Sequence, residues 1–347
     1  MSIVTNLEEV MKAKGYTLTE LAEEVGISQV NLSNIKTGKI SAIRFSTLDE
    51  ICRVLQCQPG DILKYKQRDK ERIIPLFLDY SGTTDLILRG GAEDVKKFFD
   101  SIKTMQEKTG HEIRAIMVTG SSRESARSKY SLLSDLAENE GLPHFFDGAI
   151  AEYCGYVIRN GKTEVLNTLD FRILEKRKEI EEIIGKYGGQ INSDVESMYN
   201  VLFENITRTE LAETSEKIEE LLNASDLETV TYYDDYGKEC DIKPKKHSKS
   251  TAVRMIVEDW KEKFDIPFVI IGGDSQDEDL KMYTANKDIF ESMGLRTVFV
   301  APSNFGKIAK YDKNIILSDW ENSNGIADAI EQLTERVEIR EDGGLEL

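Results

Sequence analysis

Through the first 66 residues, apolar positions recur every three or four residues, which is the spacing of amphipathic helices. Leu18, Leu21 and Val25, for example, share one face of a segment, and Ser28 then lies in the position of an N-cap. The pattern predicts a bundle of short helices over residues 7–14, 17–25, 29–36, 45–55 and 59–63. A charged connector without apolar periodicity, residues 67–72, follows the bundle.

Beyond the connector, strand-length apolar runs alternate with amphipathic helical segments. The expected strands lie at residues 73–79, 113–118, 267–271 and 296–300, and the expected helices at 92–107, 125–139, 251–263 and 326–336. This alternation predicts a parallel sheet covered by helices, an α/β Rossmann-like core over residues 73–151 and 241–338. Residues 152–240 break the alternation, since they combine helices at 172–186 and 210–222 with β-rich pieces, and they are predicted to form an inserted α+β domain.

The distribution of charge also divides the chain at the connector. The whole chain of 347 residues, long enough for two or three domains, has a net charge of −18, which argues against general affinity for nucleic acid. Residues 1–72 nevertheless carry 11 lysines and arginines against 10 acidic residues, whereas the remainder carries 34 against 53. We therefore expect a near-neutral head and an acidic body as separate units.

The sequence shows neither targeting signals nor a cysteine pattern typical of metal sites. No apolar run approaches the roughly 18 residues of a membrane span, and the chain does not begin with a basic segment followed by an apolar one. The four cysteines form no Cys-x-x-Cys pair and the three histidines are scattered, so a zinc site is not expected. Reduced thiols and a cytoplasmic location are the default expectation.

The third predicted helix presents a polar, uncharged face outward, while Leu32 and Ile35 face inward. The outward residues are Gln29, Val30, Asn31, Ser33 and Asn34. Two helices joined by a short, glycine-containing turn are typical of the DNA-binding helix-turn-helix. Residues 4–65 resemble the Cro/repressor-type (Xre-like) family, and the segments 43–52 and 57–61 resemble its short bacterial regulators.

This resemblance implies that a double-stranded DNA operator is the partner of the head. The outward residues of the third helix would enter the major groove, where Gln and Asn side chains bond to adenine edges. Lys36, Lys39 and Arg44 would contact phosphates. The alternative is a helical bundle that serves only to form a homodimer.

Four polar motifs follow the predicted strands or open the predicted helices of the body. They are Asp79-Tyr80-Ser81-Gly82-Thr83, Thr119-Gly120-Ser121, Lys249, and Gly273-Asp274-Ser275 with the acids Asp277, Glu278 and Asp279. Over residues 73–335 the chain resembles the haloacid dehalogenase (HAD) superfamily, and the insertion resembles in its place the cap of the sugar-phosphate phosphatases. The predicted fold class is therefore multi-domain, with an all-α helix-turn-helix bundle and an α/β Rossmann-like HAD core that carries an inserted α+β cap.

The HAD resemblance implies a Mg²⁺-dependent site for phosphate chemistry. Asp79 would be the nucleophile and a metal ligand, and Lys249 would offset the negative charge of Asp79 and of phosphate. The metal ligands would be Asp79, the carbonyl of Ser81, Asp274, and a further acid among Asp277, Glu278 and Asp279, between which the spacing does not choose. The residues that bind phosphate would be Thr119, Gly120, Ser121 and Lys249.

One position departs from the family pattern. Family phosphatases carry Asp two residues after the nucleophile, where it protonates the leaving oxygen and then activates water, whereas this chain has Ser81. A serine hydroxyl is a poor general acid near neutral pH, and positioned acid–base catalysis is typically worth ~10²–10⁴-fold. We therefore expect ligand binding to be retained and turnover to be weak or absent.

The residues leave two functions open. The first is a transcriptional regulator whose acidic body binds a small phosphorylated metabolite with Mg²⁺ and hydrolyses it slowly or not at all. The second is an active phosphatase of the sugar-phosphate type, whose head is a tether or a dimerisation module. A purely structural body is disfavoured by the presence of Lys249 and Asp274.

Overall fold

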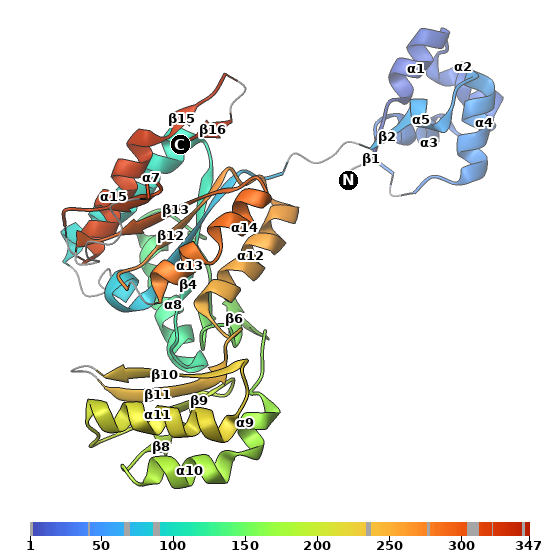
Figure 1. The fold of residues 1–347 in the computed structure, drawn as a ribbon. Coiled ribbons are helices and arrows are strands. Elements are labelled where there is room, and N and C mark those ends of the chain that lie inside the picture. The colour runs from blue at the N-terminus through green and yellow to red at the C-terminus, as the bar shows by residue number, and fades with distance from the viewer. Residues whose placement is uncertain are drawn as a thin grey trace. The chain divides into compact units, whose positions relative to one another are not determined.

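The structure is a computed structural model, and it divides the chain into two compact units, Met1–Lys70 and Glu71–Leu347 (Figure 1). The residues that it describes are 3–40, 42–65, 70–85, 91–233, 237–275, 278–303, 312–320, 322–341 and 344–347. Of the predicted connector, residues 67–72, the first three residues lie outside the described residues. Among the described helices, none has the length and apolar character needed to cross a membrane.

The first unit is a bundle of short helices with a small sheet (Figure 1). Its helices are α1 (Leu7–Lys14), α2 (Leu18–Val25), α3 (Gln29–Lys36), α4 (Phe45–Leu55) and α5 (Pro59–Ile62). They bury one apolar core, which includes Leu21, Leu32 and Ile51. The predicted helices are confirmed. Strands β1 (Ile3–Thr5) and β2 (Leu63–Tyr65) pair antiparallel and were not predicted, because three residues are too few to show an alternating pattern.

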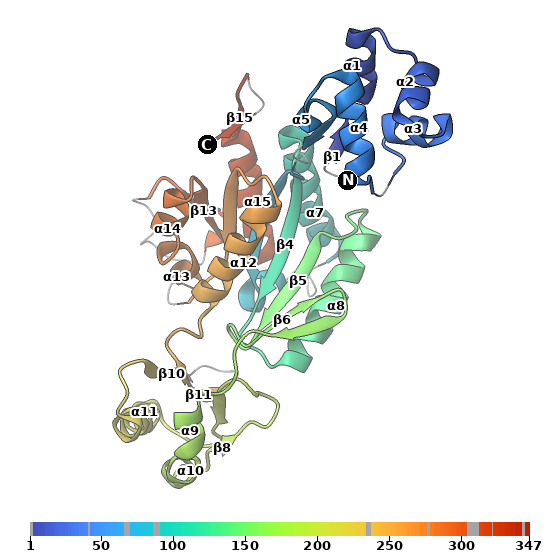
Figure 2. The same ribbon diagram turned by 90° about the vertical axis from the view of Figure 1, so that its right-hand side faces the viewer.

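The second unit is built on an eight-stranded sheet with the order β14-β13-β12-β3-β4-β5-β6-β7. Its strands are β3 (Ile73–Asp79), β4 (Glu112–Val118), β5 (Phe146–Ala151), β6 (Tyr156–Arg159), β7 (Lys162–Val165), β12 (Phe268–Gly272), β13 (Arg296–Ala301) and β14 (Ile315–Leu317). Neighbouring strands from β14 to β5 are parallel, and β6 and β7 extend the sheet as an antiparallel hairpin beside β5 (Figure 2).

Helices cover both faces of this sheet (Figure 1). One face carries α7 (Ala92–Thr109), α8 (Arg123–Asn139) and α15 (Asn322–Arg336), and the other carries α12 (Lys249–Lys263), α13 (Asp279–Thr284) and α14 (Lys287–Ser292). Leu76 and Phe98 belong to the first apolar layer, whereas Phe77 and Trp260 belong to the second. Strand β3 is thus buried on both sides, which explains its continuous apolar sequence and confirms the α/β core.

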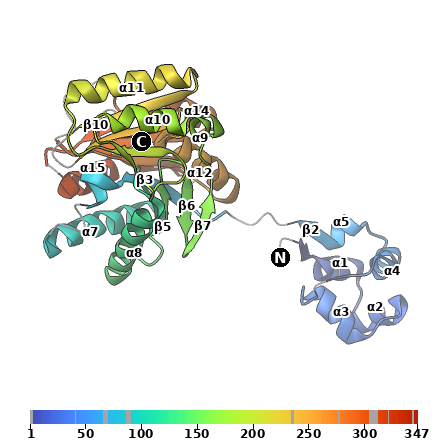
Figure 3. The same cartoon turned by 90° about the horizontal axis from the view of Figure 1, so that it is seen from below.

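A smaller domain, the cap, is inserted between β7 and α12. Its antiparallel sheet has the order β10-β11-β9-β8, and three helices pack on one face of it, away from the core (Figures 1 and 3). The elements are α9 (Phe171–Glu175), α10 (Arg177–Gly185), β8 (Gln190–Ile191), β9 (Tyr199–Leu202), α11 (Arg208–Leu222), β10 (Leu227–Tyr233) and β11 (Lys238–Pro244).

The structure shifts both boundaries of the cap from the predicted span of 152–240. Strands β6 and β7 belong to the large sheet, and β11 continues in the cap sheet as far as Pro244. The break in alternation at residue 152 therefore marks a hairpin of the core. The single helix predicted over residues 172–186 is wrong as well, because α9 and α10 are separate helices that meet at Lys176.

Candidate active site and candidate nucleic-acid interface

Asp79, the last residue of the central strand β3, is buried at the carboxyl edge of the large sheet. The tight turn Tyr80–Thr84 follows it, and the hydroxyl of Thr84 donates a hydrogen bond of 2.9 Å to the carbonyl of Asp79. Gly82 has a φ of +73°, and a Cβ atom there would lie 2.0 Å from Oδ2 of Asp274. Only glycine therefore permits this close approach of the turn to Asp274.

Lys249 and Asp279 connect the end of β3 to the loop that follows β12. Lys249 is the first residue of α12 and is buried, and its Nζ donates to Oδ1 of Asp79 at 2.7 Å and to Oδ1 of Asp279 at 2.8 Å. Oδ2 of Asp279 accepts from the backbone N–H groups of Asp274 at 3.2 Å and Ser275 at 3.1 Å. Because both of its oxygens are engaged, Asp279 positions Lys249 and the loop.

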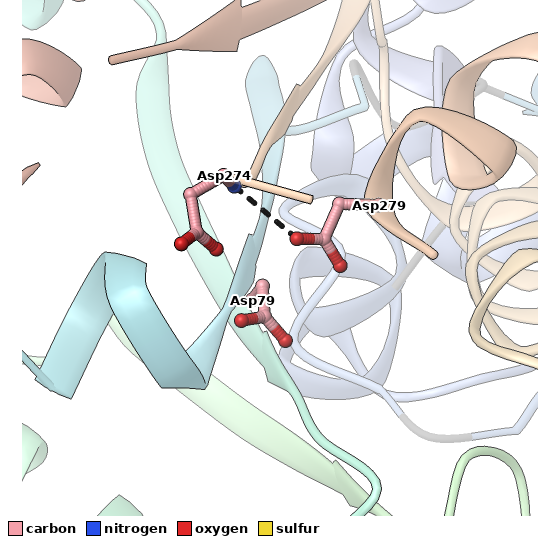
Figure 4. Close-up of side chains that lie close together, drawn as sticks. All are labelled: Asp79, Asp274 and Asp279. Atoms are coloured by element: carbon pink, nitrogen blue, oxygen red, sulfur yellow. Dashed lines mark hydrogen bonds between the residues drawn. The ribbon is translucent and has the colours of Figure 1, made fainter. Parts of the chain in front are cut away.

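Three carboxylates converge at this point (Figure 4). Each of Asp79, Asp274 and Asp279 offers an oxygen, and these oxygens all lie within 4.8 Å of one another. Lys249 is the cation bonded to this group, so the fully ionised group has more negative than positive charge. Oxygen ligands and excess negative charge are what Mg²⁺ requires. The residues therefore fit a divalent cation, for which Asp79 and Asp274 are the ligands that the geometry favours.

The pKa values of these groups follow from their burial. Burial raises the pKa of Asp79 to about 7, although the Lys249 ammonium acts in the opposite direction. Burial, with the charge of Asp279, raises the pKa of Asp274 to about 6. Burial alone would lower the pKa of Lys249, but Asp79 and Asp279 together raise it well above its usual range. The lysine therefore stays charged, and a cation at Asp79 and Asp274 would displace protons.

The second motif forms a hydroxyl-lined loop after β4. The hydroxyl of Thr119 accepts from the N–H of Ser121 at 3.1 Å and donates to the Ser121 hydroxyl at 3.0 Å. Nζ of Lys129, on α8, donates to the Ser121 hydroxyl at 2.8 Å and lies 4.0 Å from the centre of the Tyr80 ring. Lys129 thus places a second cation beside this loop. Sequence reasoning missed it, because nothing distinguishes this lysine from others on a charged helix.

Of the candidate acids after Asp274, the structure brings Asp279 to the site. Glu278, predicted as a metal ligand, is not one of the acids in the converging group, and Asp277 lies outside the described residues. The reason is local: α13 begins at Asp279, whose side chain folds back onto the N–H groups of the loop. Ser81 is exposed in the turn after Asp79, with φ −74° and ψ 130°.

In the first unit, capping residues define a two-helix motif formed by α2 and α3. Thr17 and Glu20 form a reciprocal capping box at the start of α2, and Gly26 ends that helix with a φ of +74°. The Ser28 hydroxyl then accepts from the N–H of Asn31 at 3.2 Å and starts α3. These signals fix the end of α2 and the start of α3 around a short turn with a glycine, which is the arrangement of a helix-turn-helix.

The outward face of α3 is available to a partner. Gln29, Val30 and Asn31 are exposed, Ser33 and Asn34 are half-buried, and Leu32 and Ile35 lie in the core. The amide of Gln29 donates to the Thr19 hydroxyl at 3.2 Å, which orients it on the α2 side. Lys39 and Arg44 are exposed, whereas Nζ of Lys36 lies 3.8 Å from a carboxylate oxygen of Glu8.

The fold and site define a helical domain of the helix-turn-helix type joined to an α/β domain that holds a group of carboxylates and a lysine at the carboxyl edge of its sheet. A model of the Cro/C1-type HTH DNA-binding domain matches residues 6–68, and a model of sucrose-6F-phosphate phosphohydrolase matches residues 192–333. The uncharacterized HTH-type transcriptional regulator YozG of Bacillus subtilis is 42% identical over 85 residues, which are 24% of this chain and 99% of that protein. The chain belongs to the Cro/C1-type helix-turn-helix family, and this domain is fused to a sucrose-phosphatase-like HAD domain.

Several solved structures are similar to about three quarters of the chain. The sucrose-phosphatase of Synechocystis sp. PCC6803, in complex with sucrose and phosphate, is 15% identical with a TM-score of 0.44, over 76% of this chain and 98% of that one. The C-terminal domain of the C. albicans trehalose-6-phosphate phosphatase is 14% identical with a TM-score of 0.48, over 77% and 93%.

Proposed function

We propose that the protein is a cytoplasmic DNA-binding transcriptional regulator whose HAD domain binds a small phosphorylated metabolite together with Mg²⁺. The observation that carries this proposal is the group formed by buried Asp79, Asp279 and Lys249 with half-buried Asp274, combined with an exposed serine at position 81. The parts that bind metal and phosphate are present, and the general acid of a phosphatase is replaced.

Each side chain of the site has a distinct role in this proposal. The hydroxyls of Thr119 and Ser121 and the N–H group of Gly120 bind phosphate oxygens, with Lys249 and Lys129 offsetting their charge, while the N–H of Ser121 keeps its bond to the Thr119 hydroxyl. A bound Mg²⁺ would neutralise charge between the phosphate and the carboxylates of Asp79 and Asp274. Asp279 keeps Lys249 and the loop after β12 in place, because its Oδ1 accepts from Nζ of Lys249 and its Oδ2 accepts from the N–H of Asp274.

In the head, α3 lies in the major groove in the manner of a recognition helix. Gln29, Val30, Asn31, Ser33 and Asn34 face the bases, and Lys36, Lys39 and Arg44 contact phosphates. Lys36 exchanges its long contact with Glu8 for a DNA phosphate, at little cost because exposed ion pairs are weak.

The second candidate function is an active Mg²⁺-dependent phosphatase. It is favoured by the position of Asp79, whose carboxylate is the nucleophile candidate at the end of β3 and is already oriented by Lys249 at 2.7 Å. In that case the head tethers the enzyme to DNA or forms a dimer. The two candidates share a ligand site and differ in turnover.

The test is a thermal-stability screen of the full chain against phosphorylated metabolites, with and without Mg²⁺. A ligand that binds only the folded state stabilises it by about 2.7 kcal/mol at a concentration of 100 times its Kd. We expect stabilisation by a phosphorylated compound that requires Mg²⁺ and is lost in Asp274→Asn. No stabilisation by any phosphorylated compound, including inorganic phosphate, would contradict the proposed ligand site. The same compounds, tested for release of phosphate, separate the regulator from the phosphatase.

A further inference from the structure

A fully buried carboxylate, that of Glu152, connects the core to the cap. Glu152 directly follows β5, and its Oε1 accepts from the backbone N–H of Arg123, the first residue of α8, at 3.2 Å. Its Oε2 accepts from the backbone N–H groups of Glu196 at 3.1 Å and Ser197 at 2.8 Å, which precede β9 in the cap. The two oxygens of one carboxylate therefore hold two different domains.

The chemistry of this carboxylate makes the connection sensitive to the position of both partners. Burying a carboxylate is costly, and here bonds to three backbone N–H groups offset the cost. Hydrogen bonds to an ionised acceptor are about twice as strong as neutral ones. If the cap moved away from Glu152, part of the buried charge would lose its donors. The start of α8 and the cap segment are thus fixed relative to each other.

The backbone of the same residue holds the loop of the second motif. The N–H groups of Glu152 and Tyr153 donate to the carbonyls of Ser121 at 3.0 Å and Thr119 at 3.1 Å. Glu152 and Tyr153 have φ values of 51° and 59°, a region that non-glycine residues adopt rarely. Strain of this kind persists where the surroundings impose it. Glu152 therefore binds the loop through its backbone and the cap through its side chain.

The junction on the cap side is closely packed around this carboxylate. Ser197 is fully buried, and a Cβ atom on Gly155 would lie 2.3 Å from its Oγ, so glycine permits this close approach. Farther out, the guanidinium of Arg123 bonds to both carboxylate oxygens of Glu196, at 3.0 and 3.3 Å. Because the Glu196 side chain is 51% exposed, this ion pair contributes little, and the carboxylate of Glu152 is the main link.

We propose that Glu152 is a positioning residue, which fixes the loop Thr119–Ser121 for phosphate and couples the order of this loop to the position of the cap. A phosphate bound at the loop then orders the cap segment at Glu196 and Ser197 through the Glu152 carboxylate. By linkage, a cap that is held by Glu152 raises the affinity of the loop for phosphate. The inference rests on the proposed function, because the proposed phosphate site is this loop.

The test uses Glu152→Gln in the full chain. Glutamine has the size of glutamate but one acceptor oxygen, and its NH₂ group faces the remaining N–H donors. The variant can therefore bond to Arg123 or to the cap segment, but not to both. Glu124→Gln is the matched control, since it makes the same change at an exposed carboxylate 3.3 Å from Nε of Arg123. Glu196→Gln tests the exposed ion pair separately.

Two measurements are made on each protein. Hydrogen exchange of the backbone amides is followed in peptides covering residues 119–125 and 192–199, with Mg²⁺ alone and with Mg²⁺ and saturating inorganic phosphate. Calorimetry gives the affinities for Mg²⁺ and for inorganic phosphate. In the wild type, we expect phosphate to slow exchange in both peptides. In Glu152→Gln, the slowing should be confined to residues 119–125.

The affinities should separate a positioning role from general structural support. Glu152→Gln should weaken binding of inorganic phosphate by about 3- to 10-fold, the range for one or two hydrogen bonds. Its affinity for Mg²⁺ alone should change less than about twofold, because the carboxylates that bind the metal lie on other loops. Glu124→Gln and Glu196→Gln should behave as the wild type in both measurements.

Four outcomes would count against the inference. If phosphate leaves exchange at residues 192–199 unchanged in the wild type, or if Glu152→Gln keeps the effect, the positioning role is overturned while the phosphate site stands. Equal losses of phosphate and Mg²⁺ affinity in Glu152→Gln would show general structural support instead. Loss of the effect in Glu196→Gln would assign the link to the exposed ion pair. If inorganic phosphate does not bind to the wild type with Mg²⁺, the proposed function and this inference both fail.

Discussion

Replacing Ser81 by Asp tests whether a missing general acid is what limits turnover. Ser81 lies two residues after Asp79, is exposed, and has backbone angles of φ −74° and ψ 130° that Asp adopts without strain. The new carboxyl would enter a group in which burial and neighbouring acids already raise the pKa of Asp79 to about 7. Like charges raise the pKa of a carboxyl, so they favour the protonated form that a general acid needs.

The expected gain follows from the size of acid–base catalysis. A positioned acid contributes ~10²–10⁴-fold, which corresponds to about 3–5 kcal/mol of the activation barrier. Because Ser81 is exposed, the new group keeps much of its hydration, and we expect a gain toward the lower end of this range. Ser81→Asn is the matched control, since it has the shape of Asp without an acidic proton.

The assay is hydrolysis of an aryl phosphate with Mg²⁺ by the wild type, Ser81→Asp, Ser81→Asn, and Ser81→Asp combined with Asp79→Asn. We expect Ser81→Asp alone to gain turnover and the double variant to lose it, since the nucleophile is gone. If the wild type hydrolyses the aryl phosphate as fast as an ordinary phosphatase, the proposal of a regulator with weak or no turnover is refuted, and the active-phosphatase alternative is favoured. An inactive Ser81→Asp that still binds phosphate would refute the view that the acid is the missing part.

Three further predictions concern metal, phosphate and DNA. Asp79 and Asp274 must be deprotonated to bind Mg²⁺, and their pKa values are raised to about 7 and 6. The affinity for Mg²⁺ should therefore fall as the pH drops from 8 to 5.5. A constant affinity in calorimetry would contradict the assignment of these two residues as metal ligands. Lys129→Met should weaken binding of inorganic phosphate with Mg²⁺ by several-fold. An unchanged Kd would show that Lys129 does not contribute to phosphate binding. Gln29→Ala should relax specificity at one base position by roughly 1–3 kcal/mol. Lys39→Ala should weaken binding to all DNA sequences alike and lower the slope of log affinity against log salt concentration by about 1. The reverse pattern in binding-site selection would show that α3 is not the recognition helix.

Local patterns predicted the elements that depend on local physics. The helices of the head follow from apolar periodicity and from the N-cap Ser28, which the structure places at the start of α3. Strand β3 and its terminal Asp79 follow from a continuous apolar run that stops at a carboxylate. Because parallel strands end at one edge of a sheet, the motifs after β3, β4 and β12 could be assigned to one site.

The features that sequence reasoning missed depend on contacts between distant segments. The choice of Asp279 over Glu278 depends on where α13 begins, and spacing alone does not fix that residue. The bond between Tyr153 and Asp241 joins residues 88 positions apart, so no local pattern indicates it. Likewise, the short antiparallel hairpin of β6 and β7 breaks the alternation of strands and helices as the cap does. Only the pairing of β6 with β5 assigns this hairpin to the core sheet.

A regulator that responds to a ligand requires that ligand binding in the HAD domain change the affinity of the head for DNA, and we predict such a change for this protein. The most direct measurement is the affinity of the full chain for a DNA site obtained by genome-wide selection, with and without saturating Mg²⁺ and a phosphorylated ligand that stabilises the protein. We expect a change of about 5- to 150-fold, the usual size of a coupling of 1–3 kcal/mol, and its loss in Asp274→Asn. Equal affinities in both conditions would contradict the account and leave the two domains as independent units.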